Sequence, residues 1–357
     1  MNFSYESLFQ FARSVFIRIG CSEIDADLAA RVLVSADLRG IDSHGIARLI
    51  GYIRLYDKKR INPTPDIHTL HETPSTEVLN GDGGLGLVVG PKAMEMAIDK
   101  ALNVGSGWVS VQNSNHFGIA GYHAMMAMEA DCIGIAMTNA SPLVSPTFAN
   151  DRLLGTNPIA VAIPAGEEQP FVLDMATTTA ANGKLEVLQR KGDHAPQGWI
   201  QDKEGMGSTD PKDVKAGGSL LPLGGDREHG SHKGYGLGAM VDIFSAVLSG
   251  ANYGPWVPPF VAFLDPPNDP VGKGIGHFFG AMRIDGFRPK EDFKKHMDQW
   301  LRRFRSAQTT PGESRVLVPG DPEREMEAIR SEKGIELLPP VVADLHTLAD
   351  RFGLSLE

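Results

Sequence analysis

Two kinds of apolar pattern alternate through the middle of this chain, and that alternation restricts the fold more than any other feature. Short runs rich in β-branched and aromatic residues predict strands; they occupy residues 76–80, 108–111, 132–137, 159–163, 171–173, 260–264, 278–284 and 316–318. Apolar residues at helical spacing predict helices; they occupy residues 91–103, 120–130, 183–190, 235–248, 289–304, 322–333 and 340–352. Strands and helices that alternate in this way are typical of an α/β fold.

The first 65 residues contain helical patterns alone. Ser4 and Ser22 each precede apolar residues at helical spacing, and a serine hydroxyl can cap the first amides of a helix. A third helix is expected from about His44 until the Asn-Pro-Thr-Pro segment at residues 62–65 breaks it. We therefore expect an α/β fold, α+β-like, in which helical ends flank a sheet-containing middle.

Composition narrows the classes of partner. The 357 residues carry a formal charge of −10, and the 34 Lys and Arg residues are scattered, whereas nucleic-acid binding requires clustered cations. No apolar run approaches the roughly 20 residues of a membrane-spanning helix. Cys21 and Cys132 form no CxxC pair, which fits a reducing compartment. We expect a cytoplasmic protein that binds a small molecule, with no nucleic acid and no membrane.

Residues 38–49, with the sequence LRGIDSHGIARL, concentrate reactive side chains in a short stretch. If a helix begins at His44, then His44 and Arg48 lie four residues apart on one helical face. The guanidinium fork of arginine fits a carboxylate, and histidine exchanges a proton near neutral pH. This pairing suits a small anionic substrate. The alternative is a helix–turn–helix junction in which these polar residues only cap and solvate.

Residues 81–86, GDGGLG, match the G-x-G-x-x-G fingerprint of Rossmann dinucleotide sites and follow an expected strand. A Rossmann site needs a helix that begins at the last glycine and an acidic residue at the end of the next strand. Here residues 87–90 separate the last glycine from the expected helix, and the next strand ends at Gln112 and Asn113. The motif therefore predicts a structural glycine turn.

Four other polar turns adjoin apolar segments, at residues 113–122, 154–158, 173–179 and 230–236. The junction between a strand and a helix is where α/β proteins place ligands. Asn115 and His116 lie at such a junction, although a helix cap and a hydrogen-bonded core histidine are the structural alternative. The hydroxyls that follow Leu173 can donate to phosphate, and Lys233 stands near an expected helix N-terminus.

Other uses of these histidines are weaker. His229 and His232 lie three residues apart, and His116 and His123 seven apart, without an HExxH arrangement or companion cysteines. We therefore predict no metal site. A Ser–His–Asp hydrolase would need a G-x-S-x-G elbow, which the sequence lacks.

Taken together, the polar blocks resemble the malate/L-lactate/L-sulfolactate dehydrogenase family, which is separate from the Rossmann-type malate and lactate dehydrogenases. The blocks are DSHG at residues 42–45, NHFG at 115–118, GTNP at 155–158, DMAT at 174–177 and HKGYGL at 232–237. The match is collinear from the first helix to about Asp321 and covers nearly the whole chain. It implies a non-Rossmann α/β fold, NAD or NADP as cofactor, and a homodimer with its active site near the subunit interface. It also implies an NAD(P)-binding domain at about residues 76–234, and a helical domain for substrate binding and dimerisation at residues 1–75 plus about 235–357.

The resemblance also implies roles for individual residues. In some members the histidine that matches His44 has the acid/base role, and in others the one that matches His116 has it. Arg48 matches the arginine that binds the substrate carboxylate, and Ser43 or Asn115 would orient the reacting oxygen. The expected cofactor contacts are Ser141, Asp174, Met175, Ala176, Thr177, Thr178, Thr179, His232, Lys233, Pro319, Gly320 and Asp321.

The reaction implied is reversible hydride transfer between a nicotinamide and a 2-hydroxy or 2-keto acid. Malate and oxaloacetate are the first expectation, and lactate, sulfolactate, ureidoglycolate and cyclic imino acids remain open. The second acidic group of malate needs another cation, for which Arg39, Arg54 or a residue of a partner chain are candidates. Two other classes also remain open: a metal-dependent hydrolase or lyase that uses His44, His116 and His232, and a non-catalytic binding protein on the same scaffold.

Overall fold

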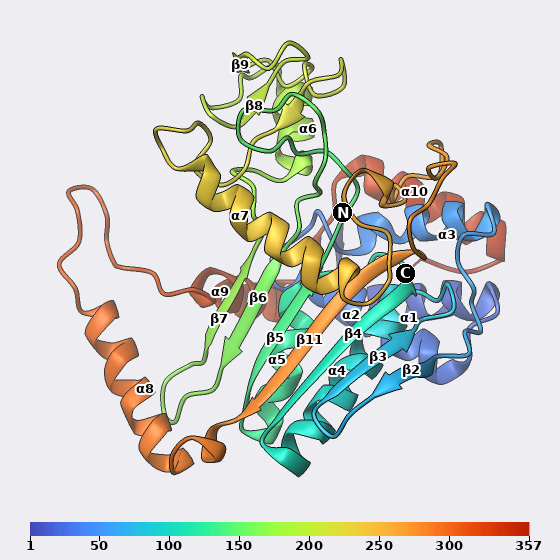
Figure 1. Ribbon diagram of the computed structural model, residues 1–357. Coiled ribbons are helices and arrows are strands. Elements are labelled where there is room, and N and C mark those ends of the chain that lie inside the picture. The colour runs from blue at the N-terminus through green and yellow to red at the C-terminus, as the bar shows by residue number, and fades with distance from the viewer. Residues whose placement is uncertain (357) are drawn as a thin grey trace.

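A mixed sheet forms the centre of the molecule in the computed structural model, which describes residues 1–356 (Figure 1). Within that range seven strands follow the order β2–β3–β4–β11–β5–β6–β7. Their bounds are β2 (His68–Glu72), β3 (Thr76–Asn80), β4 (Ser106–Ser114), β5 (Cys132–Thr138), β6 (Ile159–Ile163), β7 (Phe171–Met175) and β11 (Ile275–Arg283). Only β3 and β4 pair in parallel, and the other neighbours are antiparallel. A Rossmann sheet is mostly parallel, so this order confirms the expected non-Rossmann α/β fold.

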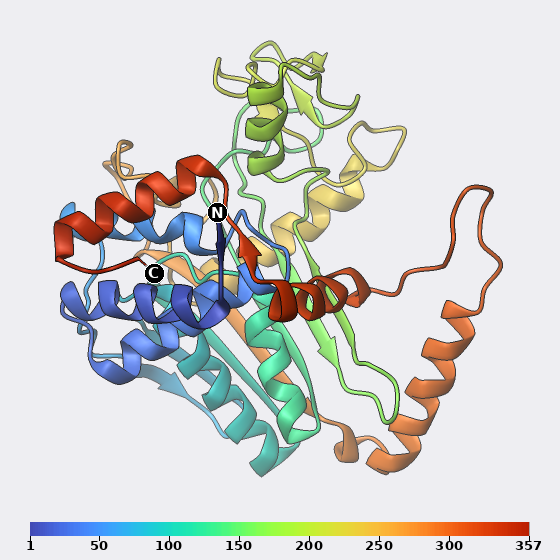
Figure 2. The same ribbon diagram turned by 180° about the vertical axis from the view of Figure 1, so that it is seen from behind.

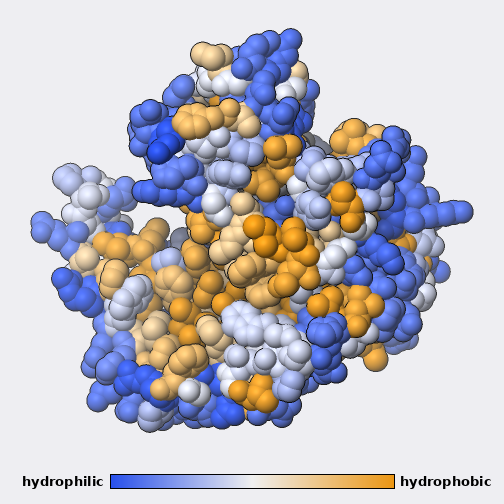
Figure 3. All heavy atoms as spheres, in the orientation of Figure 1, coloured by the Kyte–Doolittle hydropathy of each residue, from blue (hydrophilic) through white to orange (hydrophobic). Residues whose placement is uncertain are grey.

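Helices cover the two faces of the sheet unequally. Helices α4 (Gly86–Val104) and α5 (Ala120–Met126), followed by the 3-10 turn η2 (Ala127–Ala130), pack on one face (Figure 2). On the other face, α7 (Ser231–Asp242) and the π-helical turn η3 (Ile243–Val247) cross the strands diagonally (Figure 1). Apolar side chains therefore remain visible over η3 and the neighbouring strands (Figure 3).

A helical unit built from both ends of the chain adjoins the face of the sheet that α4 and α5 cover (Figure 2). Its elements are α1 (Tyr5–Arg18), α2 (Glu23–Leu38), the 3-10 turn η1 (Ile46–Arg48), α3 (Leu49–Asp57) and α10 (Pro339–Phe352), with the pair β1 (Asn2–Phe3) and β12 (Ile335–Glu336). Phe16, Leu33, Tyr52 and Leu345 are among the residues of its core. Ser4 and Ser22 cap α1 and α2 as expected, accepting hydrogen bonds from the amides of residues 7 and 25.

The remaining elements lie outside these two units. They are α6 (Asn182–Lys191), the small sheet of β8 (Ile200–Gln201), β9 (Gly207–Ser208) and β10 (Ser219–Leu220), the turns η4 (Gly254–Trp256) and η5 (Ile284–Gly286), α8 (Lys290–Arg305) and α9 (Asp321–Lys333).

The structure corrects several expected elements. Residues 260–264 and 316–318 are loops, although their composition favours strands. Arg60 donates to the carbonyl oxygens of Pro259, Val261 and Leu264, in or next to the first of these loops. In a strand, such carbonyls would pair with a neighbouring strand instead. Strand β2 was not expected, because all five of its residues are exposed and leave no apolar alternation.

The expected domain boundaries also need a correction. They place everything from about residue 235 onward in the helical domain, yet β11 lies between β4 and β5 in the middle of the sheet. The strand pattern at residues 278–284 predicts a strand but cannot show which sheet receives it. The chain therefore returns to the sheet after α7, before it completes the helical unit.

Candidate active site

The imidazole rings of His44 and His116 stack in the interior, with 5.6 Å between ring centroids and 23° between ring planes. His44 lies in the turn after α2, and His116 follows β4, so the fold brings together two segments far apart in sequence. The Phe260 ring also packs on His116, at 4.4 Å between centroids, and Tyr52 reaches the same ring from α3. Two residues predicted to be catalytic therefore share one site.

Two groups form hydrogen bonds with Nδ1 of His116. The backbone amide of Gly118 donates to its Nδ1 at 3.3 Å, and an N–H can only donate. Nδ1 is therefore an acceptor, and the Tyr52 hydroxyl also donates to it, at 2.7 Å. With Nδ1 as acceptor, a neutral ring carries its proton on Nε2.

His44, Ser43 and Arg48 form a second hydrogen-bonded group beside His116. The Ser43 hydroxyl lies 2.9 Å from Nδ1 of His44, and the Ser43 carbonyl accepts a hydrogen bond from Nε of Arg48 at 2.6 Å. The Arg48 guanidinium carbon is 6.0 Å from the centroid of the Phe260 ring. The expected third helix forms, but it starts later than His44: the 3-10 turn η1 begins at Ile46 and α3 at Leu49. A turn, and not a shared helical face, brings His44 and Arg48 together.

This environment disfavours the charged form of both imidazoles. Burial, and then the charge of Arg48, lower the pKa of His44 to about 4. Burial, followed by His44 and Arg48, holds the pKa of His116 well below its ordinary value. Burial raises the pKa of Tyr52, which therefore remains a hydroxyl donor.

Asp37 supports the turn that carries His44. Its Oδ2 accepts a hydrogen bond from the Ile46 amide at 2.6 Å, and a Cβ added to Gly45 would overlap the carboxyl group. Arg330 donates to the Asp37 carbonyl and to the Asp42 carboxylate, which fixes the same segment to α9. These contacts hold His44 against His116.

Tyr52, Phe260 and Asp37 were missed by sequence reasoning. Tyr52 stands four residues after Arg48, so its spacing was a usable signal. Asp37 was also detectable as an acidic residue on the buried side of α2. Nothing in the sequence indicated that Phe260 belongs to the site, because residues 260–264 were interpreted as a strand.

The amide group of Asn115 contacts the glycine turn. Its amide nitrogen donates to the carbonyls of Gly83 and Gly84 at 2.9 and 3.0 Å and to that of Arg60 at 3.3 Å. Carbonyls in a turn lack the partners that a β-sheet provides, and the Asn115 amide supplies hydrogen bonds to those of Gly83 and Gly84.

The glycine motif is structural, though one reason given for that expectation was wrong. Helix α4 does begin at the last glycine, Gly86, and includes Pro91. Gly86 packs so closely on the loop after β4 that a Cβ there would overlap the carbonyls of Asn115 and His116. The amides of Gly83 and Gly84 donate within the fold, to Asn113 and Gly81, at 2.8 Å each. The motif therefore positions the His116 loop.

Ser141 lies at the edge of the histidine pair. Its hydroxyl accepts a hydrogen bond from the Phe260 amide at 3.0 Å, and the Phe260 ring packs on His116. Ser141 thus fixes the loop that covers His116.

The segment after β7 contains the expected cofactor residues 174–179. Asp174 accepts a hydrogen bond from the Gly121 amide at the start of α5 at 2.8 Å. Burial raises the pKa of Asp174 to about 6, against the effect of that amide. Met175 and Ala176 are half-buried.

The threonine hydroxyls of this segment donate to backbone carbonyls. Thr177 donates to the Asn157 carbonyl at 3.1 Å, Thr178 to Ala180 at 2.9 Å and Thr179 to Leu221 at 3.3 Å. The chain is irregular here, and these hydroxyls satisfy carbonyls that lack sheet partners.

His232 and Lys233 occupy the exposed first turn of α7. Nδ1 of His232 accepts from Arg227 at 3.0 Å, while Lys233 has no side-chain hydrogen bond or ion pair to the described residues. Gly234, next along the helix, packs directly on Leu223, whose amide donates to the Thr177 carbonyl at 3.0 Å. The start of α7 therefore adjoins the segment after β7.

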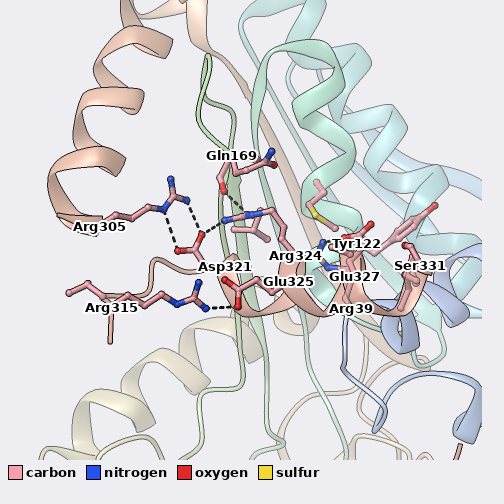
Figure 4. A pocket seen from close by; sticks show the side chains of 17 residues that line it. Arg39, Tyr122, Gln169, Arg305, Arg315, Asp321, Arg324, Glu325, Glu327 and Ser331 are labelled. Atoms are coloured by element: carbon pink, nitrogen blue, oxygen red, sulfur yellow. Dashed lines mark hydrogen bonds and ion pairs between the residues drawn. The ribbon is translucent and has the colours of Figure 1, made fainter. Parts of the chain in front are cut away.

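Pro319, Gly320 and Asp321 lie along β7 at the start of α9. The Pro319 carbonyl accepts from the Val172 amide at 3.1 Å, and Gly320 takes a left-handed φ of 97°. Asp321 borders a pocket of about 940 Å³, where it forms ion pairs with Arg305 at 2.8 Å and Arg324 at 2.6 Å (Figure 4). Burial raises the pKa of Asp321, but hydrogen bonds from Arg305, the Val318 amide and Arg324 lower it to about 2. The Asp321 carboxylate therefore already has hydrogen-bond partners within the protein.

Two further features concern metals and membranes. Residues 1–356 contain no group of three His, Cys, Asp or Glu side chains arranged to hold a metal ion, so His44, His116 and His232 do not form the cluster that the metal-dependent alternative requires. Among the same residues, no helix combines the length and apolar character needed to cross a bilayer.

Comparison with known proteins is consistent with this geometry. Residues 3–346 match the family described as malate/L-lactate dehydrogenase. The malate dehydrogenase of Pyrococcus horikoshii is 42% identical over 351 residues, which cover 98% of this chain and 95% of that protein. The L-sulfolactate dehydrogenase of Methanocaldococcus jannaschii is 40% identical, with 96% and 95% covered. The crystal structure of malate dehydrogenase from Entamoeba histolytica superposes with a TM-score of 0.92, at 36% identity and with 99% of each chain covered. The chain therefore belongs to the malate/L-lactate dehydrogenase family, and it is a 2-hydroxy acid dehydrogenase of a kind that uses a nicotinamide cofactor.

Proposed function

We propose that this enzyme interconverts malate and oxaloacetate with NAD or NADP as cofactor, and that His44 exchanges the proton with the substrate oxygen. The observation that carries the proposal is the meeting of two stacked neutral imidazoles with Arg48 beside a cleft of about 1010 Å³. The malate dehydrogenases among the relatives support the choice of malate over lactate, sulfolactate, ureidoglycolate or a cyclic imino acid.

Arg48 binds the carboxylate next to the reacting carbon. Its Nε is fixed on the Ser43 carbonyl, while its two terminal nitrogens have no partner among residues 1–356. A guanidinium held at one nitrogen keeps a planar pair of donors for a carboxylate. Arg48 and Phe260 both line the cleft, so the carboxylate enters from that side.

His116 orients the reacting oxygen as a hydrogen-bond donor. Its Nδ1 already accepts from Gly118 and Tyr52, so its Nε2 carries the proton. A neutral imidazole in this state donates to a keto oxygen but has no free lone pair with which to act as a base.

His44 is suited to exchange the proton. Its Nδ1 faces the Ser43 hydroxyl, which can either donate or accept. His44 can therefore hold its proton on either nitrogen, as a reversible proton transfer requires. Nε2 of His44 has no partner among the described residues and is the atom that would meet the substrate.

Substrate binding adjusts the proton affinity of His44. After burial, the positive charge of Arg48 is the second cause that lowers its pKa to about 4. A carboxylate bound to Arg48 neutralises this charge, so the pKa of His44 rises when the anionic substrate is present. His44 then gains the proton it needs for reduction of the keto group.

The available residues fit a dinucleotide. The ammonium group of Lys233 has no partner among residues 1–356 and lies in the first turn of α7, where helix amides also favour phosphate, and His232 precedes it. Ser141 and Asp174 would hold the part of the cofactor nearer the histidine pair. When bound, the nicotinamide supplies or accepts the hydride.

We also propose a cytoplasmic homodimer. Several apolar residues of α7 and η3 are exposed in the single chain, and apolar patches of this kind are typical of interfaces (Figure 3). They are Leu237, Ile243, Phe244, Val247 and Leu248. Both cysteines are free thiols, which supports a reducing compartment. Sedimentation should give twice the chain mass, and Val247→Glu should give monomers; a monomeric wild type would contradict the dimer.

The experiment that tests the function is oxidation of NADH and of NADPH, followed by absorbance, against oxaloacetate, pyruvate and other 2-keto acids. We expect the highest kcat/KM with oxaloacetate. Absence of turnover with every 2-keto acid would overturn the proposal, and a clear preference for another keto acid would replace malate as the substrate.

A further inference from the structure

One face of α3 and the turn before it lines the cleft beside Arg48. Ala47, Gly51, Arg54 and Lys58 all border this cleft and follow helical spacing, four, three and four residues apart. Arg48 borders its inner end, next to the histidine pair. The face therefore runs from the site of proton transfer to two further cations.

The inner part of this face leaves room for a substrate. Ala47 contributes only a methyl group and Gly51 no side chain, and a Cβ on Gly51 would make an ordinary van der Waals contact with the Phe260 ring at 3.6 Å. Arg54 begins about 9 Å along the helix axis from Arg48 at a rise of ~1.5 Å per residue. Because both guanidinium side chains border the same cleft, they can contact two ends of one small molecule bound in it.

Arg54 is available for binding. It is exposed, and its side chain has no hydrogen bond or ion pair with any described residue. Two of the acidic side chains that border the cleft already have partners: Asp57 forms an ion pair with Arg351 at 2.6 Å, and Glu186 accepts from Asn182. Asp265 acts electrostatically on Arg60.

The other nearby arginines are committed elsewhere. Arg39 is buried, pairs with Glu327 at 2.8 Å and faces the separate pocket that contains Asp321 (Figure 4). Arg60 donates to three carbonyls of the loop after Pro259. Of the two candidates within this chain for the second acidic group, Arg54 is the one that reaches the cleft.

We propose that Arg54 binds the second anionic group of the substrate and thereby selects 2-keto acids with two negative charges over those with one. This inference rests on the proposed function, because it places the keto-acid carboxylate on Arg48. A carboxylate or a sulfonate on the carbon beside the keto group offers the same chemistry to a guanidinium. Lys58, one turn further out, adds charge at the mouth of the cleft.

The test compares wild type, Arg54→Ala and Arg54→Lys with oxaloacetate, 3-sulfopyruvate and pyruvate, using the preferred reduced cofactor. Arg303→Ala is the matched control, since Arg303 is also an exposed helical arginine without a side-chain partner among the described residues. We expect Arg54→Ala to lower kcat/KM for the dianionic substrates on the order of 10- to 100-fold, the worth of a charge-assisted hydrogen-bonded contact. The kcat/KM for pyruvate should change less than about twofold. For the dianionic substrates, the kcat/KM of Arg54→Lys should lie between those of wild type and Arg54→Ala.

The outcomes separate the two proposals. Equal losses for oxaloacetate and pyruvate, or no loss for either dianion, would overturn the role of Arg54 while leaving the dehydrogenase function standing. A wild type that reduces none of the three acids would remove the proposed function and this inference together. If Arg54→Ala lowers kcat/KM for oxaloacetate alone, Arg54 recognises a carboxylate, and if it does so for 3-sulfopyruvate alone, Arg54 recognises a sulfonate. An unchanged cofactor KM in each variant shows that the variants are folded.

Discussion

The carboxyl group of Asp37 lies directly beneath Gly45, where an added methyl group would overlap it. One carboxyl oxygen holds the Ile46 amide at 2.6 Å, and the other has no hydrogen-bond partner among residues 1–356. A buried carboxyl in this state ties the end of α2 to the turn that carries His44, at a cost in desolvation. Asp37 is therefore a positioning residue for His44.

The pKa of Asp37 makes the stability of the fold depend on pH. Burial raises this pKa to about 8, and the Ile46 amide opposes the rise. The folded state then binds more protons than the unfolded state between the ordinary value of 3.8 and about 8, so the free energy of unfolding decreases as pH rises through that window. We expect Asp37→Asn, which still offers an oxygen to Ile46, to show a weaker decrease. Urea unfolding at several pH values within the window measures both slopes, and equal slopes would contradict this role.

The close approach of Gly86 to the His116 loop gives a paired prediction. Gly86→Ala should destabilise the protein by about 3 kcal/mol or more and lower kcat, because the methyl group must displace the carbonyls of Asn115 and His116. Gly83→Ala, at a φ of 68° with only Asn62 nearby, should cost about 1 kcal/mol and leave the cofactor KM unchanged. Chemical unfolding and steady-state kinetics measure both effects. A specific rise in cofactor KM for Gly83→Ala would instead support a dinucleotide site at the glycine motif.

Arg48→Lys tests the carboxylate contact. Lysine keeps the charge but lacks the planar fork and the Nε donor that Ser43 accepts. We expect the KM for the keto acid to rise about tenfold or more, with the cofactor KM unchanged, as initial-rate kinetics with each substrate varied would show. If the keto-acid KM stays at its wild-type value, the carboxylate binds elsewhere.

Lys233→Ala tests the cofactor site. Loss of a phosphate contact that is the same in ground and transition states should raise the cofactor KM more than it lowers kcat. Lys295→Ala is the control, since Lys295 is likewise exposed on a helix and has no side-chain partner in the described part of the chain. Identical cofactor KM values in the two variants would remove Lys233 from the site.

Much of the fold was predictable because local patterns carry it. Strands β3 and β6 have the expected bounds, and Ser4 and Ser22 cap their helices as their sequence context indicates. The position of β11 was not predictable, because its partners β4 and β5 lie more than a hundred residues earlier in the chain. Pairing between distant strands depends on the whole fold, which no local pattern contains.

The site shows the same division. The meeting of His44 with His116 was suggested by their residue types and by the family resemblance, and the structure brings them together. What the side chains bind was not predictable: Asn115 and the threonines after β7 carry donors that suit a ligand, yet their partners are backbone carbonyls. Irregular backbone creates that demand, and only the folded chain reveals it.

The most direct test of the central claim is a comparison of kcat and its pH profile in His44→Ala and His116→Ala. If His44 exchanges the proton while His116 donates a hydrogen bond, His44→Ala should lose about 10²- to 10⁴-fold in kcat together with one limb of the pH profile. His116→Ala should keep both limbs and mainly raise the keto-acid KM. The reverse pattern would exchange the two roles. Wild-type kinetics in both variants would contradict the placement of the active site at this histidine pair.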